Sequence, residues 1–531
     1  MSRKTLLIGL DGASFDLLEP WIRQGKLAVF SSILERGVHG ILKSTIPCQT
    51  CPAVPSLYTG KNPGNTGLFS FLDPDGNLVT SATLPDKPLW EILNEHGKRV
   101  VVLNLQTTYP AEKIDGAMVC HTNHPEGKND LWHPADLAPL LSDFYQGTDD
   151  FNREHDLLYD GDETGVRQTY ELVEKRYEIF ERIIDRIDPQ FAVFWIAKSD
   201  DVHHFSWRHP DRILEFYQHM EKLLKRIIDT HDDTDILIVS DHGVADMPEH
   251  TFAINEWLSR EGYFVRRTSL TTAIKCRIRS FLLAHLPVSI LNKLVALRER
   301  RAQKKDTTTV TTEKAVLVDM RAKLVDVDWK TTRAYCENAW GIRLNRKIVD
   351  SNSKEFDTLR DEIIRQMKEL TIDGVRIFRE VHTRKELYPG KYVEQLPDII
   401  FTLGPKLALD RQEYGGLLKP YKPRAKYGYH TYERDGIFIG VGPDFKRNHR
   451  TAPMEIYDIP PLILFLNDLP VPKDFDGSVH KEILAEDSAY AGKDVEYTDA
   501  RSIRKRKVRD ITEREREEMM DSLRALGYLD E

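Results

Sequence analysis

The sequence predicts an α/β fold whose mostly parallel sheet is covered by helices on both faces. Short, continuously apolar runs such as TLLIGL at residues 5–10 alternate with longer segments of helical periodicity. Strands without polar alternation are typical of a parallel sheet that is buried on both faces. In such sheets, ligands gather at the carboxyl ends of the strands. The residues that follow each apolar run are therefore the first candidates for a site.

Four strand and helix pairs carry this prediction. The strands are residues 5–10, 99–105, 191–197 and 235–240, and the helices are residues 15–37, 89–96, 163–188 and 211–230. Strand patterns resume beyond residue 333, in RAYCENAWGIRLN, DGVRIFREVHT, LPDIIFTLG and RDGIFIGVGP. The sheet elements are thus expected on both sides of an insertion.

The predicted organisation has four parts, which together account for the 531 residues. They are the first part of the α/β core at 1–265, a basic helical insertion or cap at 266–332, the second part of the core at 333–485, and a charged tail with a C-terminal helix at 486–531. In the tail, Met519, Leu523 and Leu526 recur at helical spacing, which favours a helix that docks on the core. The alternative is a basic patch for phosphorylated partners.

Charge and cysteine content exclude several classes of protein. The chain has 75 Lys and Arg against 84 Asp and Glu, a net charge of −9, which gives no general signal of nucleic-acid binding. Five cysteines form too sparse a set for a disulfide framework, so we expect reduced thiols. The apolar run at the start is too short for a secretory signal. We expect a cytoplasmic protein, and the sequence leaves its oligomeric state open.

Residues 273–305 hold an apolar centre between two basic flanks. Four residues interrupt this centre: His285, Pro287, Asn292 and Lys293. A membrane span is therefore excluded, because it needs about 20 consecutive apolar residues. Two interpretations stay open. The segment is either a helical cap packed on the core or an interfacial basic element that makes peripheral membrane contact.

Three predicted strands end in acidic residues, and histidines accompany two of them. Asp11 follows the first strand, Asp200 the third and Asp241 the fourth. Carboxylates that converge on one sheet edge repel each other unless cations neutralise them. His204 lies one helical turn after Asp200, and His242 is adjacent to Asp241. Oxygen and imidazole ligands together indicate a metal site for zinc, with manganese or iron as alternatives.

A loop rich in Pro, Gly, Ser and Thr spans residues 44–71 and leads into a helix around residues 54–58. Its TGKNPG stretch resembles a phosphate-binding P-loop only superficially. Pro55 replaces the first glycine of that motif, and Asn62 replaces the Ser or Thr after its lysine. We exclude a P-loop.

Thr50 is the candidate nucleophile of this loop. A threonine hydroxyl attacks poorly at its free pKa, and metal coordination is one way to activate it. Cys48 and Cys51 flank Thr50 as a C-x-x-C pair. No second pair follows at zinc-ribbon spacing and no redox context surrounds them, so we interpret both as ordinary residues.

Several motifs recur along the chain in a defined order. They are GLDG at 9–12, Thr50-Cys51-Pro52, LYTG at 57–60, NPG at 62–64, Asp200-x-x-x-His204, VSDHG at 239–243, His430 before a Gly-rich strand, and the closing segment at 457–479. Their order and spacing resemble the alkaline phosphatase superfamily, and most closely its type I phosphodiesterase/nucleotide pyrophosphatase branch. The resemblance covers most of residues 1–265 and about 333–480.

The resemblance implies a hydrolase of phosphate esters with two divalent metal ions, zinc or manganese. The ligands that it assigns to one ion are Asp11, Thr50, Asp241 and His242, and those of the other are Asp200, His204 and His430. Thr50 would attack phosphorus and form a phospho-threonine intermediate, which water then hydrolyses. The role of His430 depends on the resemblance alone.

Departures from the family pattern bear on the substrate. Phe71 occupies the position at which nucleotide pyrophosphatases carry an Asn that contacts the phosphoryl oxygen. The Arg that clamps a monoester in alkaline phosphatases has no clear counterpart, and Lys61 is the candidate substitute unless it caps the turn. Val54 stands where sulfatases carry an Arg, which argues against a sulfatase.

The sequence therefore predicts a two-metal phosphoesterase that prefers diesters to monoesters. The alternative is a transferase or hydrolase at a membrane surface, with residues 273–305 as the docking element and a lipid-linked phosphate as substrate. A metal-binding scaffold without catalysis is disfavoured, because all seven ligand positions are present.

Overall fold

The computed structural model describes residues 4–72, 77–121, 130–141, 144, 157–158, 160–267, 324, 327–411, 416–421, 432–499, 503–504 and 508–525. His430, Cys276 and most of the predicted insertion, including residues 273–305, lie outside this set. Within it, no helix is both long enough and apolar enough to cross a membrane. Cytoplasmic location and membrane contact stay predictions.

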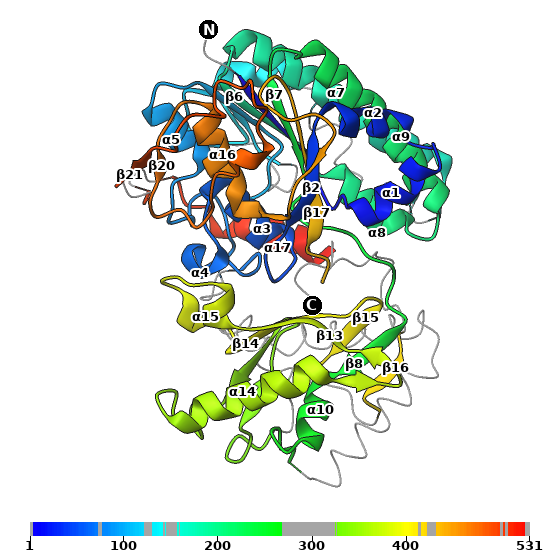
Figure 1. Cartoon of the computed structure of the whole chain (residues 1–531), viewed down its shortest axis with the longest axis vertical. Coiled ribbons are helices and arrows are strands. Elements are labelled where there is room, and N and C mark those ends of the chain that lie inside the picture. Colours follow the sequence, from blue (N-terminus) through cyan, green and yellow to red (C-terminus); the bar gives the residue numbers. More distant parts are fainter. Residues whose placement is uncertain are drawn as a thin grey trace.

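A ten-stranded sheet forms the centre of the larger part of the molecule (Figure 1). In spatial order the strands are β18 (His449–Arg450), β2 (Val38–Lys43), β17 (Asp435–Val441), β7 (Asp235–Val239), β1 (Thr5–Leu10), β6 (Phe191–Ile196), β3 (Val100–Leu103), β4 (Gly116–Val119) and β5 (Trp132–His133), and β19 (Met454–Glu455) pairs with β2. β1 is parallel to both β6 and β7, and β3 is parallel to β6 and β4. β17 is antiparallel to its neighbours. The prediction of a mostly parallel sheet is confirmed.

Helices cover both faces of this sheet (Figure 1). On one side lie α1 (Phe15–Arg23), α2 (Ala28–Arg36), α7 (Glu163–Ile187), α8 (Lys198–Ser206) and α9 (Pro210–Thr230), and on the other lie α3 (Thr50–Thr59), α5 (Leu89–Glu95) and α16 (Ile459–Leu466). Every residue of β1, β6 and β7 is buried as a result. This explains why their sequences are apolar without alternation.

The predicted helix at residues 15–37 is two helices, α1 and α2. Gly25 lies between them with a φ of +71°. A residue in the left-handed region cannot continue a right-handed helix, and glycine adopts that region without steric cost. The chain therefore turns at Gly25 and starts a second helix.

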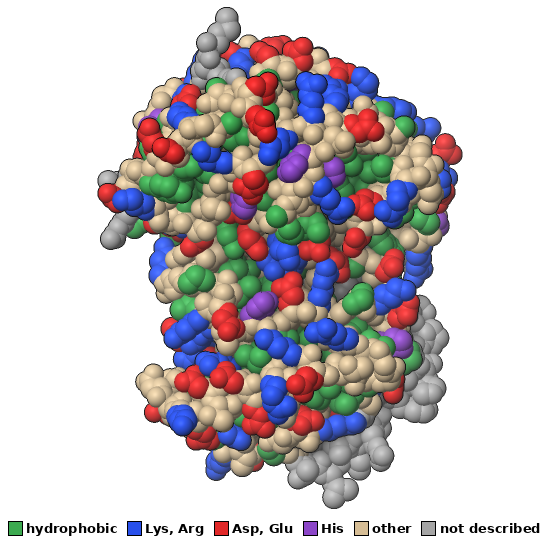
Figure 2. Space-filling model, viewed as in Figure 1, with side chains coloured by type: hydrophobic (Ala, Val, Ile, Leu, Met, Phe, Trp, Pro, Cys, Tyr) green, Lys and Arg blue, Asp and Glu red, His purple; other side chains and the backbone are tan. Residues whose placement is uncertain are grey.

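A second, smaller part of the molecule has its own sheets. We call it the small module: the described residues of 250–265 and 327–420. It contains β8 (His250–Ala253), α10 (Ile254–Arg260), β9 (Ala334–Cys336), β10 (Gly341–Leu344), α14 (Lys354–Glu369), β13 (Phe378–Thr383), β14 (Ile399–Leu403), β15 (Leu407–Asp410) and β16 (Leu418–Pro420). Lys and Arg side chains lie along its junction with the larger part, interspersed with Asp and Glu (Figure 2).

The small module divides the predicted second core segment, 333–485. Only β17 to β19 of that segment join the strands of the central sheet, whereas β9, β10, β13 and β14 form a separate four-stranded sheet with a separate apolar cluster. The burial pattern gives the physical reason. In β13 most residues are exposed or half-buried, as expected for a sheet that is not covered on both faces, while β1 is buried throughout.

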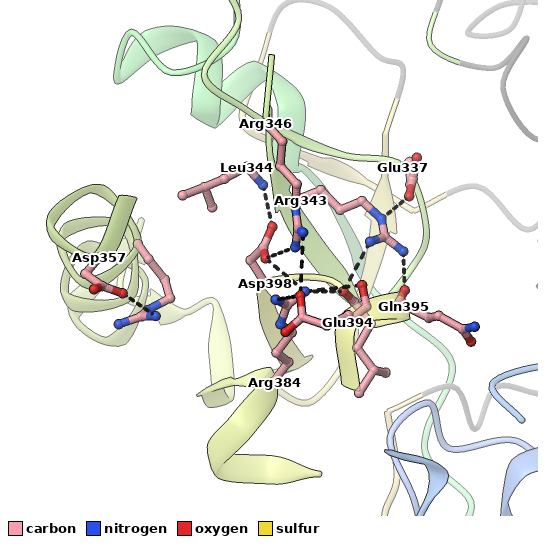
Figure 3. Close-up of polar contacts among 11 residues, drawn as sticks. Glu337, Arg343, Leu344, Arg346, Asp357, Arg384, Glu394, Gln395 and Asp398 are labelled. Atoms are coloured by element: carbon pink, nitrogen blue, oxygen red, sulfur yellow. Dashed lines mark hydrogen bonds and ion pairs between the residues drawn. The ribbon is translucent and has the colours of Figure 1, made fainter. Parts of the chain in front are cut away.

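An ion-pair network fixes one end of the small module (Figure 3). The buried carboxylate of Asp398 accepts hydrogen bonds from the Leu344 amide at 2.8 Å and from Arg346 at 3.1 Å, and it forms an ion pair with Arg384 at 3.3 Å. Arg384 also contacts Glu394. Each of these guanidinium groups thus has carboxylate partners.

The C-terminal helix α17 (Glu513–Ala525) lies against the larger part. Met519 and Met520 are buried in the main apolar core. Arg504, ahead of the helix, is buried and forms ion pairs with Glu91 and Glu112. The described part of the tail is therefore packed on the core.

Gly9, in the middle of β1, is a test of the packing beneath the sheet edge. A Cβ there would lie 2.0 Å from Cε3 of the buried Trp195, so Gly9→Ala forces the indole to move. We expect a loss of about 1–3 kcal/mol in the free energy of unfolding, measured by urea titration. The control is Gly492→Ala, whose Cβ meets no atom within 4 Å and should cost less than about 0.5 kcal/mol. Equal stability of the two variants would contradict this packing.

Candidate active site

The three predicted acidic residues follow adjacent strands of the central sheet. β1 lies between β6 and β7 and is parallel to both, so their carboxyl ends share one edge. Asp11 follows β1, Asp200 lies in the first turn of α8 after β6, and Asp241 follows β7. Strand order therefore brings together residues that are up to 230 positions apart in sequence.

Asp11, Asp200 and His242 form a buried group that fits a metal ion. One ligand atom from each lies within 4.8 Å of the other two. Asp11 Oδ1 and Asp241 Oδ2 are buried and have no hydrogen-bond partner among the described residues. A cation is the partner that such oxygens lack. Burial, together with the charges of Asp241 and Asp200, raises the pKa of Asp11 well above its ordinary value.

Gly12 lies close to the candidate metal ligands, at a position where the backbone leaves no room for a side chain. Its φ is +69°, and a Cβ at this position would lie 2.9 Å from Asp200 Oδ1. The Gly12 amide donates to Asp241 Oδ1 at 3.3 Å, which leaves Oδ2 directed elsewhere. Any side chain here would push Asp200 out of the group.

His242 lies between Thr50 and the carboxylates. Its Nε2 is 3.3 Å from Thr50 Oγ1, 3.5 Å from Asp241 Oδ2 and 3.7 Å from Asp11 Oδ1. Its Nδ1 is 3.0 Å from the carbonyl oxygen of Gly243. A carbonyl only accepts, so Nδ1 carries the proton in this contact and Nε2 keeps a lone pair for a metal ion or a hydroxyl proton.

Thr50 is the first residue of α3 and is fully buried. The N-terminus of a helix carries partial positive charge, which stabilises a developing alkoxide or a phosphate group there. The predicted helix around residues 54–58 is confirmed and begins four residues earlier. Thr50 is thus placed at the helix start rather than in the loop before it.

Asp200 and His204 lie one turn apart on α8, and His204 Nε2 is 3.1 Å from Asp200 Oδ2. Both side chains therefore leave the helix on the same face, as their spacing predicts. The structure brings six of the seven predicted ligands to one edge. The seventh, His430, lies outside the described residues.

Lys61 has a different role from the predicted phosphate contact. Its ammonium is buried and pairs with Asp86 at 2.9 Å and with Asp474 at 3.0 Å. Two carboxylates satisfy its charge, so we assign Lys61 to the joining of the α3 loop to the C-terminal segment. Asp474 is 413 positions away, and sequence spacing could not have indicated it.

The residues flanking Thr50 do not point to redox chemistry. Cys48 and Cys51 form no disulfide and are fully buried, and burial raises the pKa of both thiols. Cys51 donates to the carbonyl of Ser70 at 3.0 Å. Protonated, buried thiols are poor nucleophiles and poor metal ligands.

Two residues that sequence reasoning missed orient Asp11. Trp195 Nε1 and Gln106 Nε2 donate to Asp11 Oδ2 at 3.0 and 3.2 Å, and Oδ1 is left for a cation. Gln106 follows β3 at the same sheet edge as the acids. The rule that residues after each strand deserve attention, applied to β3, would have found it.

His203 is a third missed residue. It is buried, its Nε2 is 2.9 Å from the hydroxyl of Tyr217, and burial lowers its pKa to about 3. It is therefore a neutral imidazole packed beside Gly12, whose added Cβ would lie 3.0 Å from His203 Nδ1. Sequence reasoning missed His203 because the adjacent His204 has the expected spacing of one helical turn from Asp200.

Comparison with known families places the chain among phosphoesterases. The sequence model of the family described as type I phosphodiesterase / nucleotide pyrophosphatase matches residues 5–432. The chain belongs to this family. The resemblance to the alkaline phosphatase superfamily and the prediction of a phosphoric ester hydrolase are confirmed. In the family two metal ions are typical, and the buried Asp and His group is the candidate site for them.

Comparison with solved structures returned members of the same enzyme group. Murine ectonucleotide pyrophosphatase / phosphodiesterase 5 is 12% identical, covers 91% of this chain and all of its own, and has a TM-score of 0.46. The human protein of the same name is 14% identical over 91% of this chain, with a TM-score of 0.44. Among curated protein sequences none matches the chain.

Removal of one site charge tests whether the carboxylates need a cation. With chelator at pH 8, we expect Asp11→Asn to raise the melting temperature by about 2 °C or more, because it relieves repulsion from Asp200 and Asp241. With added Zn²⁺ the wild type should have the higher melting temperature of the two, since Zn²⁺ binding stabilises it more than it stabilises Asp11→Asn. Asp487→Asn, an exposed control, should change neither value. A wild type that is more stable than Asp11→Asn in chelator would contradict this view.

The role of Gln106 is testable through metal affinity. Gln106→Leu removes one of the two donors that orient Asp11. We expect this change to weaken Zn²⁺ binding by up to about tenfold. Competition with a chromophoric chelator measures the affinity. The matched control is Gln218→Leu, whose amide donates to the Lys26 carbonyl at 3.1 Å away from the site. Equal affinities of the two variants would remove Gln106 from the site.

Proposed function

We propose that this family member is a phosphodiesterase that uses Thr50 as its nucleophile. It uses two divalent ions, with zinc as the preferred metal and manganese as the alternative. One observation supports this most directly: Thr50 Oγ1 lies 3.3 Å from His242 Nε2, beside buried carboxylates that lack a counterion. A hydroxyl placed beside a cation site is an arrangement that activates a threonine nucleophile.

The ligand sets follow the family resemblance. Asp11, Thr50, Asp241 and His242 hold one ion, and Asp200 and His204, with His430, hold the other. When bound, the ions supply positive charge that favours the Thr50 alkoxide and neutralises the leaving oxygen. The buried oxygens Asp11 Oδ1 and Asp241 Oδ2 fit this role, because they have no hydrogen-bond partner among the described residues.

The residues of the chain support two displacements in sequence. Thr50 attacks phosphorus, an O–P bond forms on its oxygen, the ester bond to the leaving group breaks, and the proton lost by the Thr50 hydroxyl ends on the leaving alcohol. The helix start at Thr50 places backbone amides toward the phosphoryl group and favours its negative charge. A water then breaks the Thr50–phosphate bond, which restores the hydroxyl and releases the product.

The preference for diesters rests on the positive charge available near Thr50. A monoester dianion carries one more negative charge than a diester and needs a further cation. Lys61, the candidate for that cation, is already paired with Asp86 and Asp474. Phe71 is buried in the apolar core, where the nucleotide pyrophosphatases have a polar contact. The pairing of Lys61 favours a diester over a monoester. Phe71 favours a diester other than the substrates of the nucleotide pyrophosphatases.

The nucleophile is tested by the hydrolysis of bis-p-nitrophenyl phosphate. We expect Thr50→Ala to lower kcat at least about 1,000-fold, since water must then attack directly, and Thr50→Ser to keep part of the activity. Ser56→Ala is the matched control, because its hydroxyl lies on the same helix and donates to the Pro52 carbonyl at 3.0 Å. Full activity of Thr50→Ala would contradict the mechanism.

A substrate panel tests the diester preference separately. At equal metal content, we expect kcat/KM for bis-p-nitrophenyl phosphate to exceed that for p-nitrophenyl phosphate by about tenfold or more, because Lys61, the candidate cation for the second charge, is already paired with Asp86 and Asp474. A higher value for the monoester would overturn the preference and leave the role of Thr50 intact.

A further inference from the structure

A cavity of about 690 Å³ lies between the central sheet and the small module. Lys43 of β2, Arg434, Glu455 and Tyr457 line it on the side of the central sheet. On the side of the module it is lined by residues of α14, β12 (Val375–Arg376), β13 and α15 (Arg384–Leu387). β17 is antiparallel to both β2 and β7, so β2 runs parallel to β7. Lys43, at the carboxyl end of β2, therefore lies at the same sheet edge as Asp241, two strand spacings or about 10 Å to the side.

Among the described residues, three cations that line this cavity form no ion pair at contact distance, although Lys43 acts at longer range on Glu380 and Glu455, and Lys368 on Glu386. These three cations are Lys43 from the sheet and Lys368 and Arg376 from the module. Lys43 is half-buried, and the other two are exposed. The arginines around Asp398 provide a contrast, because carboxylates satisfy each of them (Figure 3). Unpaired charges from two parts of the molecule thus face one cavity.

The acidic residues of the cavity are already engaged. Glu380 and Glu455 each accept a hydrogen bond from Arg434 at 3.0 Å, and Glu386 accepts one from the Thr383 amide at 2.9 Å. Burial alone raises the pKa of Glu380, but the hydrogen bond with His382 and the charges of Arg434 and Lys43 outweigh it and lower the pKa to about 2. Arg434 takes up most of the charge of Glu380 and Glu455, so the basic residues that line the cavity outnumber the acidic ones that remain to balance them.

We propose that this cavity binds an anion that carries phosphate. Lys presents a point charge and Arg a planar fork, and both suit phosphate oxygens. Their spread over two sides of the cavity favours an anion with more than one charge. The volume falls within the range of about 300–1,000 Å³ that small-molecule sites have, which allows a ligand of nucleotide size.

The floor of the cavity is preformed. Arg434 is nearly fully buried, and its guanidinium is fixed by Glu380, Glu455 and the carbonyl of Ser44, the last at 2.8 Å. A rigid floor lowers the ordering cost of binding. The anion then needs to order only Lys43, Lys368 and Arg376.

The phosphate has two sources that share this chemistry. It is either a distant phosphate of the substrate whose ester is cleaved at Thr50, or a separate phosphate compound. The first source rests on the proposed function, and the second does not. A distant substrate phosphate would compete with pyrophosphate in kinetic assays, whereas a separate ligand would bind together with the substrate.

Titration calorimetry with inorganic pyrophosphate on the full chain tests the proposal. The background variant is Asp241→Asn, which removes a predicted metal ligand and with it anion binding at the active site. We expect one saturable pyrophosphate site, which Lys43→Gln with Arg376→Gln weakens about tenfold or more. The matched control is Lys330→Gln with Lys354→Gln, which removes two exposed charges of the same module outside the cavity and should change the affinity less than about twofold.

Two results would overturn the proposal: no saturable binding of pyrophosphate at millimolar concentration, or equal weakening by the cavity and control pairs. The same calorimetry at higher salt should show weaker binding, because the contacts are electrostatic. Loss of hydrolysis in Thr50→Ala together with unchanged pyrophosphate binding separates this site from the active site. A result that contradicts the Thr50 mechanism would therefore not contradict the anion site. A result that contradicts the anion site would likewise not contradict the Thr50 mechanism.

Discussion

Repulsion among three buried carboxylates is the constraint around which the larger part of the molecule is arranged. Asp11, Asp200 and Asp241 follow three neighbouring parallel strands, so the hydrogen-bonded spacing of the sheet fixes their separation before any ligand arrives. Low local polarity strengthens their repulsion relative to water. The apolar strands and the helices on both faces offset this cost. The site is therefore preorganised by the sheet, and a cation completes its charge balance.

The residues around the carboxylates restrict which oxygen faces the site. Trp195 and Gln106 occupy one oxygen of Asp11, and the Gly12 amide occupies one oxygen of Asp241. The other oxygen of each remains without a hydrogen-bond partner among the described residues. When hydrogen-bond donors hold one oxygen of a carboxylate, the other oxygen is oriented toward a metal ion. The same logic applies to His242, whose Nδ1 contact with a carbonyl leaves Nε2 beside Thr50.

The sequence was sufficient to predict the parallel sheet and the acids at its edge, because both depend on local patterns: continuous apolar runs and the residues that follow them. It could not predict the partners of Lys61, since Asp474 is brought to it only by the packing of the C-terminal segment. Gln106 was missed because an amide after a strand carries no distinctive signal. The small module was assigned to the core because a strand such as β14 is as apolar and as fully buried as the core strands, so its pattern alone does not show which sheet it joins.

The small module also holds the loop that leads to Thr50. The hydroxyl of Tyr388 accepts a hydrogen bond from the Ile46 amide at 2.5 Å, and Arg434 donates to the Ser44 carbonyl while it pairs with Glu380 of β13. These backbone groups lie four and six positions before Thr50. Because buried backbone groups that lose their partners are costly, the loop keeps this path only while the module is in place. The position of the nucleophile therefore depends on residues more than 300 positions away, and the two parts of the molecule act as one structure at the active site.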